Sequence, residues 1–301
     1  GEGSASLLPA HVEQIQARFK DKFTIQPTLH SWGKGIQVNS LREPFNDRNV
    51  RMAMHLALDR DEWVDFNMAA GISGVHRHTL WMPPGSIWAL PDEELGEMPG
   101  WRRGQGKIDD IAEANRLLDE ALGAGVRFSV ECMAQGAQMY IDGCEWFHDQ
   151  MKKNLDVEVT ISSVESAVQG DRGRGSQYDV HYGSKVLTNV ADPDDFYMIH
   201  LIKERESWYY RGTGREEAEP ELAAKLVDLV ERQSRELDVA KRVEIVHNIE
   251  RILATEAMFS IPYPWTYIFP AWSNDIQGWT LYPHPSQNKW AQWERMWLDR
   301  N

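Results

Sequence analysis

The sequence predicts an α/β protein with a mixed sheet flanked by helices. Two kinds of segment alternate along the chain. In one kind, apolar and polar residues alternate, which is typical of strands; in the other, apolar residues recur every three to four positions, which is typical of helices. Because this alternation continues through the 301 residues, the order of the segments favours a sheet covered by helices.

Composition and charge narrow the class of protein. Hydrophobic residues make up 42% and charged residues 26% of the chain, a balance typical of globular domains. The net charge of −14 disfavours nucleic acid as a partner, because phosphate binding needs a basic face. No run of about 18 apolar residues is present, so we expect no membrane span. The first residues, GEGSASLLPAHVEQ, lack the regions of a signal peptide, which leaves a cytosolic protein or a processed or trimmed chain.

The N-terminal segments predict one helix and then strands. A helix is expected over residues 6–19. The stretch FTIQPTLHSWGKGIQVNS, residues 23–40, alternates and carries a Trp-Gly-Lys-Gly turn, which predicts two strand segments.

The stretch EPFNDRNVRMAMHLALDRDEWV, residues 43–64, predicts two helices in succession. Pro44 excludes a helix just before it, and Asn46 or Asp47 is expected to cap the first helix. The apolar residues of this helix share one face: Val50, Ala53, Met54 and Ala57. Asp59 followed by Glu62 is a capping-box pattern that starts the second helix.

Later elements follow from the same signals. Asp110 with Glu113 is expected to cap a helix over 110–122 that ends at Gly123, and Asp192-Pro193 to start another. The remaining predicted strands are 126–133, 156–162, 178–184, 259–269 and 290–299. The remaining predicted helices are one through 146–155 and two over 220–235 and 238–257. In the last helix, the residues expected on one apolar side are Val239, Val243, Val246, Ile249 and Leu253.

The two cysteines are too few for a disulfide framework, so the fold must depend on its core. Thiols twelve residues apart could pair. However, Cys132 falls in a strand pattern and Cys144 in a helix pattern, which disfavours a bond between them.

Several segments resemble, in order, those of the bacterial extracellular solute-binding proteins, family 5. PFNDRNVRMAMHLALDRDEWV is similar to that family's PF-[ND]-D-xx-VRxAxxxAxDR segment. The later segments that resemble the family are DIAEANRLLDEAL, FHDQMKKNLDVEVTIS, YDVHYGS with ADPDDF, KRVEIVHNIERILATEAMFSIPY and the C-terminal NDIQGW and MWLD. The resemblance runs from about residue 7 to the end of the chain.

The resemblance implies a periplasmic-binding-protein-like (type II) fold and the C-terminal portion of a bilobal protein, since family members are commonly about twice as long. Residues 1–40 would belong to the first lobe, residues 41–262 would form the second lobe, and residues 263–301 would return to the first. The implied function is the substrate-binding component of an ABC importer in the periplasm or outside the cell. Its partners would be a peptide or small solute, a membrane permease and the missing N-terminal half.

One departure from the family concerns the ligand. Peptide-binding members place an Asp about three residues before the Asp-Pro, where it pairs with the ammonium of the peptide. Here this position is Asn189, or Thr188 with a shift of one residue. A buried ammonium without a counter-charge is costly, so a neutral ligand such as an oligosaccharide gains weight.

Candidate ligand contacts come from the family positions and from the loops that follow strands. They are Trp32, Tyr140, Tyr182, Lys185, Thr188, Asn189 and Trp265. Core or loop packing is the alternative for each aromatic residue, and a solvated surface charge is the alternative for Lys185.

The sequence has no signature of catalysis, so we expect a protein that is not an enzyme and has no cofactor. His76 and His78 lack a third zinc ligand at known spacing, and DRGRGSQ, residues 171–177, lacks the end of a P-loop and is interpreted as a surface turn. Two alternatives remain: a stand-alone interaction module derived from this fold, and a hydrolase that uses two carboxylates.

Overall fold

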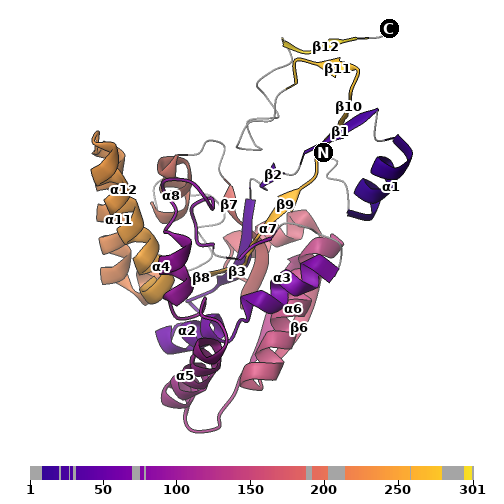
Figure 1. Cartoon of the computed structure of the whole chain (residues 1–301). Helices are drawn as coiled ribbons and strands as arrows, with labels where there is room; N and C mark the ends of the chain where they lie inside the picture. The colour runs from indigo at the N-terminus through magenta and orange to yellow at the C-terminus, as the bar shows by residue number, and fades with distance from the viewer. Residues whose placement is uncertain are drawn as a thin grey trace.

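The computed structural model describes residues 9–19, 22–26, 28–29, 32–69, 75–77, 79–187, 192–202, 214–257, 259–279 and 295–299 (Figure 1). Its centre is a five-stranded mixed sheet in the order β6-β5-β7-β3-β8. The strands of this sheet are β3 (Trp32–Val38), β5 (Ser129–Gln135), β6 (Glu158–Val164), β7 (Val180–Leu187) and β8 (Ser260–Pro262). β5 runs parallel to β6 and β7, whereas β3 is antiparallel to β7 and β8. The predicted α/β class with a mixed sheet is therefore confirmed.

Helices cover both faces of this sheet. α6 (Gln138–Leu155) connects β5 to the edge strand β6, and α7 (Ser166–Arg174) connects β6 back across β5 to β7. The two connections run in opposite directions along the sheet, so right-handed crossovers put the two helices on opposite faces. Neighbouring side chains of β5 agree with this arrangement, because successive residues of a strand point to opposite faces. Glu131 pairs with Arg172 of α7, whereas Cys132 is bonded to Cys144 of α6.

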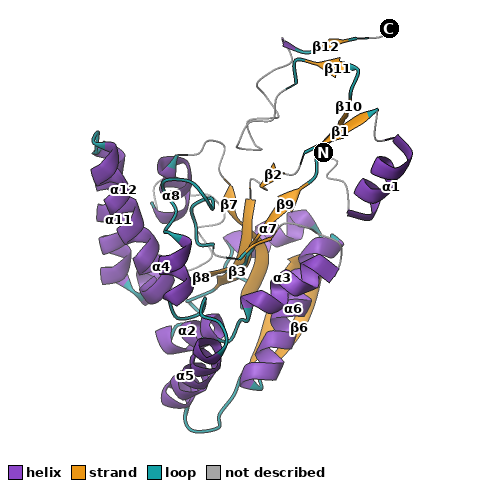
Figure 2. Ribbon diagram, in the orientation of Figure 1, coloured by secondary structure: helices purple, strands orange, loops and turns teal. Residues whose placement is uncertain are grey.

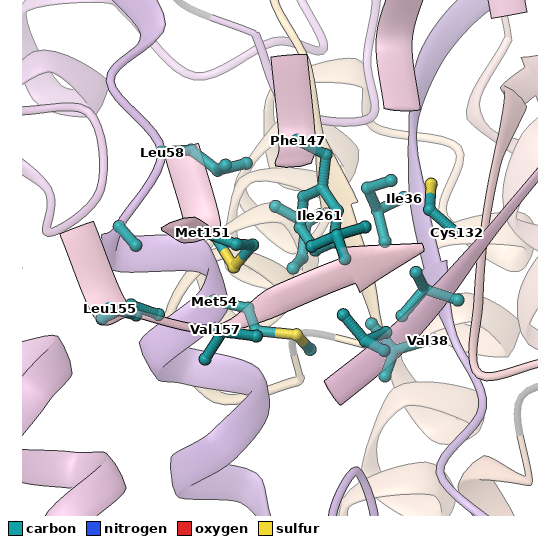
Figure 3. Packing of buried hydrophobic residues seen from close by; sticks show 14 of the residues in the cluster. Ile36, Val38, Met54, Leu58, Cys132, Phe147, Met151, Leu155, Val157 and Ile261 are labelled. Carbon is teal, nitrogen blue, oxygen red and sulfur yellow. The ribbon is translucent and has the colours of Figure 1, made fainter. Parts of the chain in front are cut away.

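The main hydrophobic core lies between the sheet and three helices, α2 (Arg48–Leu56), α5 (Gln105–Leu122) and α6 (Figure 3). Ile36, Val38 and Ile261 from the sheet meet Met54 of α2 and Phe147 of α6, and all five side chains are fully buried. α3 (Arg60–Ala69) adds Trp63 to the same core.

A second core lies among helices from two parts of the chain, one before β5 and the others between β7 and β8. Its helices are α4 (Asp92–Glu97), α8 (Pro193–Leu201), α11 (Pro220–Arg235), α12 (Val239–Ile252) and the π-helical turn η2 (Leu253–Ala257), and the short α10 (Arg215–Ala218) precedes α11. Figure 2 shows these helices at one side of the sheet. No helix among the described residues is long and apolar enough to cross a membrane.

Two distant chain segments form one antiparallel ribbon that leaves the sheet. β1 (Phe23–Ile25) pairs with β10 (Ala271–Ser273), β2 (Thr28–Leu29) with β9 (Trp265–Ile268), and β3 with β8. β4 (Val75–His76) joins the other side of β9. The ribbon leads toward α1 (Pro9–Phe19) and the pair β11 (Ile276–Gln277) and β12 (Trp297–Leu298) (Figure 1). The chain therefore enters and leaves the α/β body through neighbouring strands.

Several predicted helix boundaries are confirmed. Asp47 caps α2 by accepting a hydrogen bond from the Asn49 N–H, and Asp192 caps α8 in the same way. Gly123 ends α5 with φ of 103°. The predicted cap at Asp110 is wrong, because α5 begins five residues earlier and the Asp110 carboxylate is buried against Gly100 and Arg102.

Other predicted elements differ from the structure. Residues 166–174, which include most of the predicted surface turn, form α7. The strand predicted over 259–269 is divided into β8 and β9 by Tyr263 and Pro264. Val239 is 58% exposed and does not share the buried side of α12.

The expectation that Cys132 and Cys144 stay unpaired is wrong. Cys132 lies in a strand and Cys144 in a helix, as predicted, but α6 folds back over β5 and brings their Cα atoms to 5.9 Å. The two residues form a disulfide, and both are fully buried.

Candidate functional site

The topology gathers most of the candidate segments at one edge of the five-stranded sheet. The carboxyl ends of the parallel strands β5 and β7 meet there, followed by Tyr140 and by the 188–191 segment. β3 is antiparallel to β7, so its first residues lie at the same edge, and so does the end of β8. Ligands of α/β proteins bind outside the carboxyl ends of the strands, which makes this edge the candidate site.

The structure describes the backbone of two candidates, Trp32 and Lys185, and not their side chains. Trp32 begins β3 and pairs with Leu187, the last residue of β7, and Lys185 lies two residues before that pair. Nothing further is described for the side chains of Trp32 and Lys185. Thr188 and Asn189 lie outside the described residues. These four assignments remain predictions, although the register brings Trp32 next to the start of the 188–191 segment.

Tyr182 and Tyr140 lie in an aromatic cluster under this edge. The Tyr182 ring is fully buried, 4.9 Å from the ring of Tyr263 and 6.3 Å from that of Tyr140, measured between centroids. Its close packing depends on Gly143 of α6, where an added Cβ would come within 2.1 Å of the Tyr182 ring. Tyr140 is 7% exposed and lies in the first turn of α6. Packing therefore accounts for the position of Tyr182, and Tyr140 lies nearer the surface. The assignment of both residues as ligand contacts remains a prediction.

Trp265 is also buried in this chain. Its side chain is 1% exposed and belongs to the second hydrophobic core, while its backbone pairs with His76 across β9 and β4. Packing accounts for its position, and its assignment as a ligand contact remains a prediction.

Lys34 is a candidate that the sequence did not single out. It follows a bulge in β3, and its ammonium lies 5.5 Å from the centroid of the Tyr140 ring, within the range of a cation–π contact. Lys34 belongs to the ribbon and Tyr140 to α6, so this contact connects the ribbon to the carboxyl end of β5. The sequence does not predict the contact between Lys34 and Tyr140, because it depends on long-range packing of α6.

Hydrogen bonds to charged side chains hold the start of α8, which follows residues 188–191 in the chain. Arg242 of α12 donates to both carboxylate oxygens of Asp192 at 3.0 and 2.7 Å. Asp194 accepts hydrogen bonds from Gln233 and, at 3.0 Å, from Ser234 of α11. Burial raises the pKa of Asp192, but hydrogen bonds from Arg242 and the Asp194 N–H outweigh it and leave the pKa below its usual value. Asp192 and Asp194 therefore fix the start of α8.

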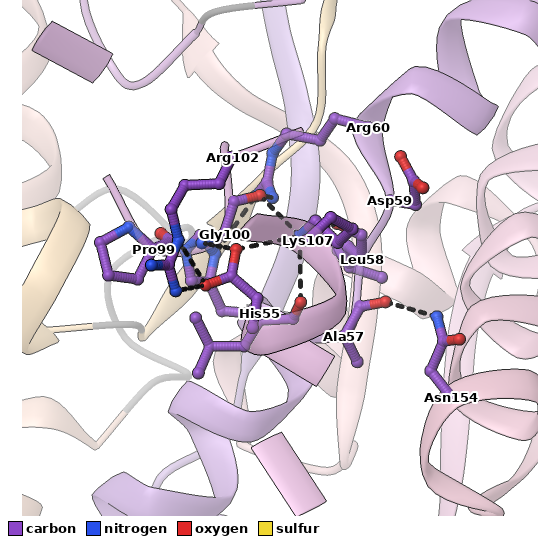
Figure 4. Close-up of polar contacts among 12 residues, drawn as sticks. His55, Ala57, Leu58, Asp59, Arg60, Pro99, Gly100, Arg102, Lys107 and Asn154 are labelled. Atoms are coloured by element: carbon purple, nitrogen blue, oxygen red, sulfur yellow. Dashed lines mark hydrogen bonds and ion pairs between the residues drawn. The ribbon is translucent and has the colours of Figure 1, made fainter. Parts of the chain in front are cut away.

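A buried polar network joins the two helices of the 43–64 stretch to the base of the ribbon (Figure 4). Arg60 is fully buried and donates to the carbonyl oxygens of Gly100 at 2.6 Å and of Pro262, the last residue of β8, at 3.0 Å. It also donates to Nδ1 of His55, so His55 Nε2 carries the proton donated to the Pro99 carbonyl at 3.1 Å. Burial and the neighbouring Arg60 hold the pKa of His55 well below its usual value.

Lys107 completes this network. Its ammonium donates to the carbonyl oxygens of Leu56 and Leu58, where α2 ends, and to that of Gly100. Burial and the nearby Arg60 lower the pKa of Lys107 to about 8. The junction between α2 and α3, at Asp59 and Arg60, thus has a structural role and is held by buried hydrogen bonds.

Glu250 of α12 is a buried carboxylate, and in the described part of the chain its hydrogen-bond donors are all uncharged. It accepts from the Trp81 and Met82 N–H groups at 3.1 and 3.2 Å and from the Tyr197 hydroxyl at 2.6 Å. Burial raises the pKa of Glu250 to about 7, against the opposing effect of these donors. Glu250 is part of the second core and lies apart from the candidate edge.

The described residues offer binding groups and no metal site. Among them, no three His, Cys, Asp or Glu side chains come together as metal ligands, and His78 of the pair considered above is outside the description. The described part of the candidate edge instead has the Tyr140 ring and the Lys34 ammonium beside a two-stranded connection.

An α/β body entered and left through adjacent strands is the architecture of one lobe of a periplasmic binding protein. The chain belongs to the bacterial extracellular solute-binding proteins, family 5, whose middle-region sequence model matches residues 3–207. This confirms the family that the sequence segments indicated, and the family consists of binding proteins. A search of curated proteins finds no match.

Solved structures of low sequence identity share the fold. The murein tripeptide binding protein MppA of Escherichia coli is similar with a TM-score of 0.75 and 18% identity, over 98% of this chain and 53% of that chain. The oligopeptide-binding protein AppA of Bacillus subtilis, in complex with a nonapeptide, gives 0.72 and 18%, over 98% and 56%. AgaA of A. tumefaciens, in complex with agropinic acid, gives 0.68 and 15%, over 97% and 55%. The chain thus spans about half the length of these proteins.

Proposed function

We propose that the chain forms the second lobe, with the connections to the first, of a substrate-binding component of an ABC importer. The observation that carries this proposal is the contact of Lys34 with Tyr140 at the sheet edge where β3 begins and β7 ends, in a chain of the solute-binding family. Capture would follow closure of two lobes about the ribbon of β1–β3 with β8–β10, and the closed form would be recognised by a membrane permease.

The ligand proposed for this site is a peptide or small solute whose binding does not need a carboxylate of the protein to pair with an ammonium group of the ligand. The position that holds an Asp in peptide-binding members is Asn189 or Thr188 here. AgaA, whose fold is similar, is described in complex with agropinic acid, so the fold also serves ligands other than peptides. An oligosaccharide that stacks on Trp32 or Tyr140 fits the same reasoning.

Calorimetric titration of the complete protein with trialanine and with N-acetyl-trialanine tests this ligand class. We expect the two peptides, if bound, to differ by less than about threefold in Kd, because acetylation removes a charge that the site does not use. Asn189→Asp is the matched variant, and it should favour the free peptide by on the order of tenfold. A parent protein that already prefers the free peptide by such a factor would contradict the proposal.

The partner proposed for the chain is the portion that its relatives carry beyond the half matched here. Four exposed large apolar side chains lie in the segments expected to belong to the first lobe, and others lie elsewhere on the described chain: the four are Phe19, Phe23, Trp297 and Leu298. Two of the described sheets there have only two strands, which leaves edges for further pairing. Such surfaces are typical of an interface.

Two measurements test this partner. The DNA upstream of the Gly1 codon should continue in frame for roughly the length that separates this chain from its relatives. The isolated chain should also bind a dye that reports exposed apolar surface, and the chain joined to its partner portion should bind much less. Negligible dye binding by the isolated chain would favour the stand-alone module instead.

The location proposed for the protein is the periplasm or the cell exterior. The disulfide between Cys132 and Cys144 supports it, because disulfides persist mainly in oxidising compartments.

A further inference from the structure

The disulfide lies directly under the candidate edge. Cys132 is in the middle of β5, and Cys144 is in the second turn of α6. Tyr140 precedes Cys144 by one helical turn, so the two side chains lie on the same face of α6, toward the sheet. The bond therefore fixes α6 to β5 one turn away from the ring that approaches Lys34.

Besides the disulfide, the described contacts of the start of α6 with the sheet are mainly packing, with one hydrogen bond from Tyr263. Its N-cap residue, Ala137, offers no side-chain hydrogen bond to the first turn. The Tyr263 hydroxyl donates to the Gly143 carbonyl at 3.0 Å, and the Gly143 backbone lies against the Tyr182 ring. These contacts require α6 to stay close to the sheet, because even one methyl group at Gly143 would clash with that ring.

The second half of α6 is held independently of the disulfide. Phe147, Met151 and Leu155 are buried in the main core, and Gln150 bonds to the Asp59 N–H and to Glu62. Loss of the disulfide should therefore loosen the first two turns of α6 more than the last three.

We propose that the Cys132–Cys144 disulfide is a positioning element of the ligand site: it holds the first turns of α6 on the sheet and so keeps Tyr140 at Lys34. This inference rests on the proposed function for its meaning, but the geometry can be measured without any solute. Each thiol gives up one proton and one electron as the S–S bond forms. The two electrons reduce a disulfide of a thiol-oxidising protein to two thiols, by thiol–disulfide exchange.

Hydrogen exchange of backbone amides in the complete protein tests the positioning role. In the Cys132→Ala/Cys144→Ala double variant, amides of 138–143 should exchange about tenfold faster, while those of 147–155 stay close to the parent. Leu118→Ala is the matched control, since it removes a fully buried side chain of the same core on α5 and should change both halves of α6 together. Equal acceleration of both halves in the double variant would overturn the proposal.

A second measurement tests the proposal even if the double variant does not fold. The unaltered protein, made once in a reducing cytosol and once with export, supplies the dithiol and the disulfide without loss of side chains. Alkylation after denaturation should modify two cysteines in the first preparation and none in the second. Two modified cysteines in the exported protein, or identical exchange of 138–143 in the two preparations, would also overturn it. Because these readouts need no ligand, their failure is distinct from failure of the proposed function.

Discussion

Glu250 gives the sharpest test of the described interior. Its carboxylate is fully buried among α12, α8 and the 81–82 segment, and burial raises its pKa from 4.5 to about 7. The folded state therefore binds this proton more tightly than the unfolded state does. The resulting stabilisation is complete below pH 4.5 and is lost as the pH rises through 7.

The size of this effect follows from the two pKa values. A shift from 4.5 to about 7 makes the free energy of unfolding at pH 5 higher than at pH 8 by on the order of 2–3 kcal/mol, from this group alone. Glu250→Gln keeps the shape: its amide oxygen accepts from the two backbone N–H groups and its amide nitrogen donates to the Tyr197 oxygen. The variant should therefore lose this difference between the two pH values.

Urea unfolding of the parent and of Glu250→Gln at pH 5 and pH 8 measures the effect. Glu94→Gln is a suitable control, because a hydrogen bond from Arg251 lowers the pKa of Glu94, so its removal should not reduce the advantage at pH 5. If Glu250→Gln and the parent show the same difference between pH 5 and pH 8, Glu250 is not the buried proton-binding group described.

Three further changes test packing. Gly143→Ala places a methyl group 2.1 Å from the Tyr182 ring and should destabilise the chain by about 1–3 kcal/mol in urea unfolding; parent-like stability would show that the ring lies elsewhere. Arg60→Ala leaves the Gly100 and Pro262 carbonyls without this donor and should cost about 3 kcal/mol, with Arg60→Lys intermediate; equal stability of both variants to the parent would contradict the network. Removal of the Cys132–Cys144 bond, which closes a short loop, should cost about 3 kcal/mol, and a loss near zero would count against it.

The sequence correctly predicted helix starts that depend only on residues close by in the chain. Asp47 and Asp192 cap helices because a carboxylate just before a helix accepts from its first N–H groups. Asp110 carries the same pattern and does not act as a cap. In α5, the Lys107 ammonium donates to the Leu56 carbonyl at the end of α2, and the helix begins at Gln105, before Lys107. This contact between two helices is a feature of the tertiary structure that the local pattern does not contain.

Long-range pairing explains most of what the sequence could not predict. The ribbon joins 23–38 to 260–273, and nothing in either segment identifies the other as its partner. The disulfide likewise depends on the fold-back of α6 over β5. For the site, sequence reasoning selected aromatic residues by position, but it could not show that Tyr182 and Trp265 would be buried or that Lys34 would face Tyr140.

Native mass spectrometry of the complete, exported protein addresses solute capture itself. The protein should carry a small molecule that is retained in the native spectrum and released on denaturation, and Trp32→Ala should carry less of it. A protein that retains no molecule, and gives no heat of binding with peptides, oligosaccharides or opines, would contradict the proposed role in capture.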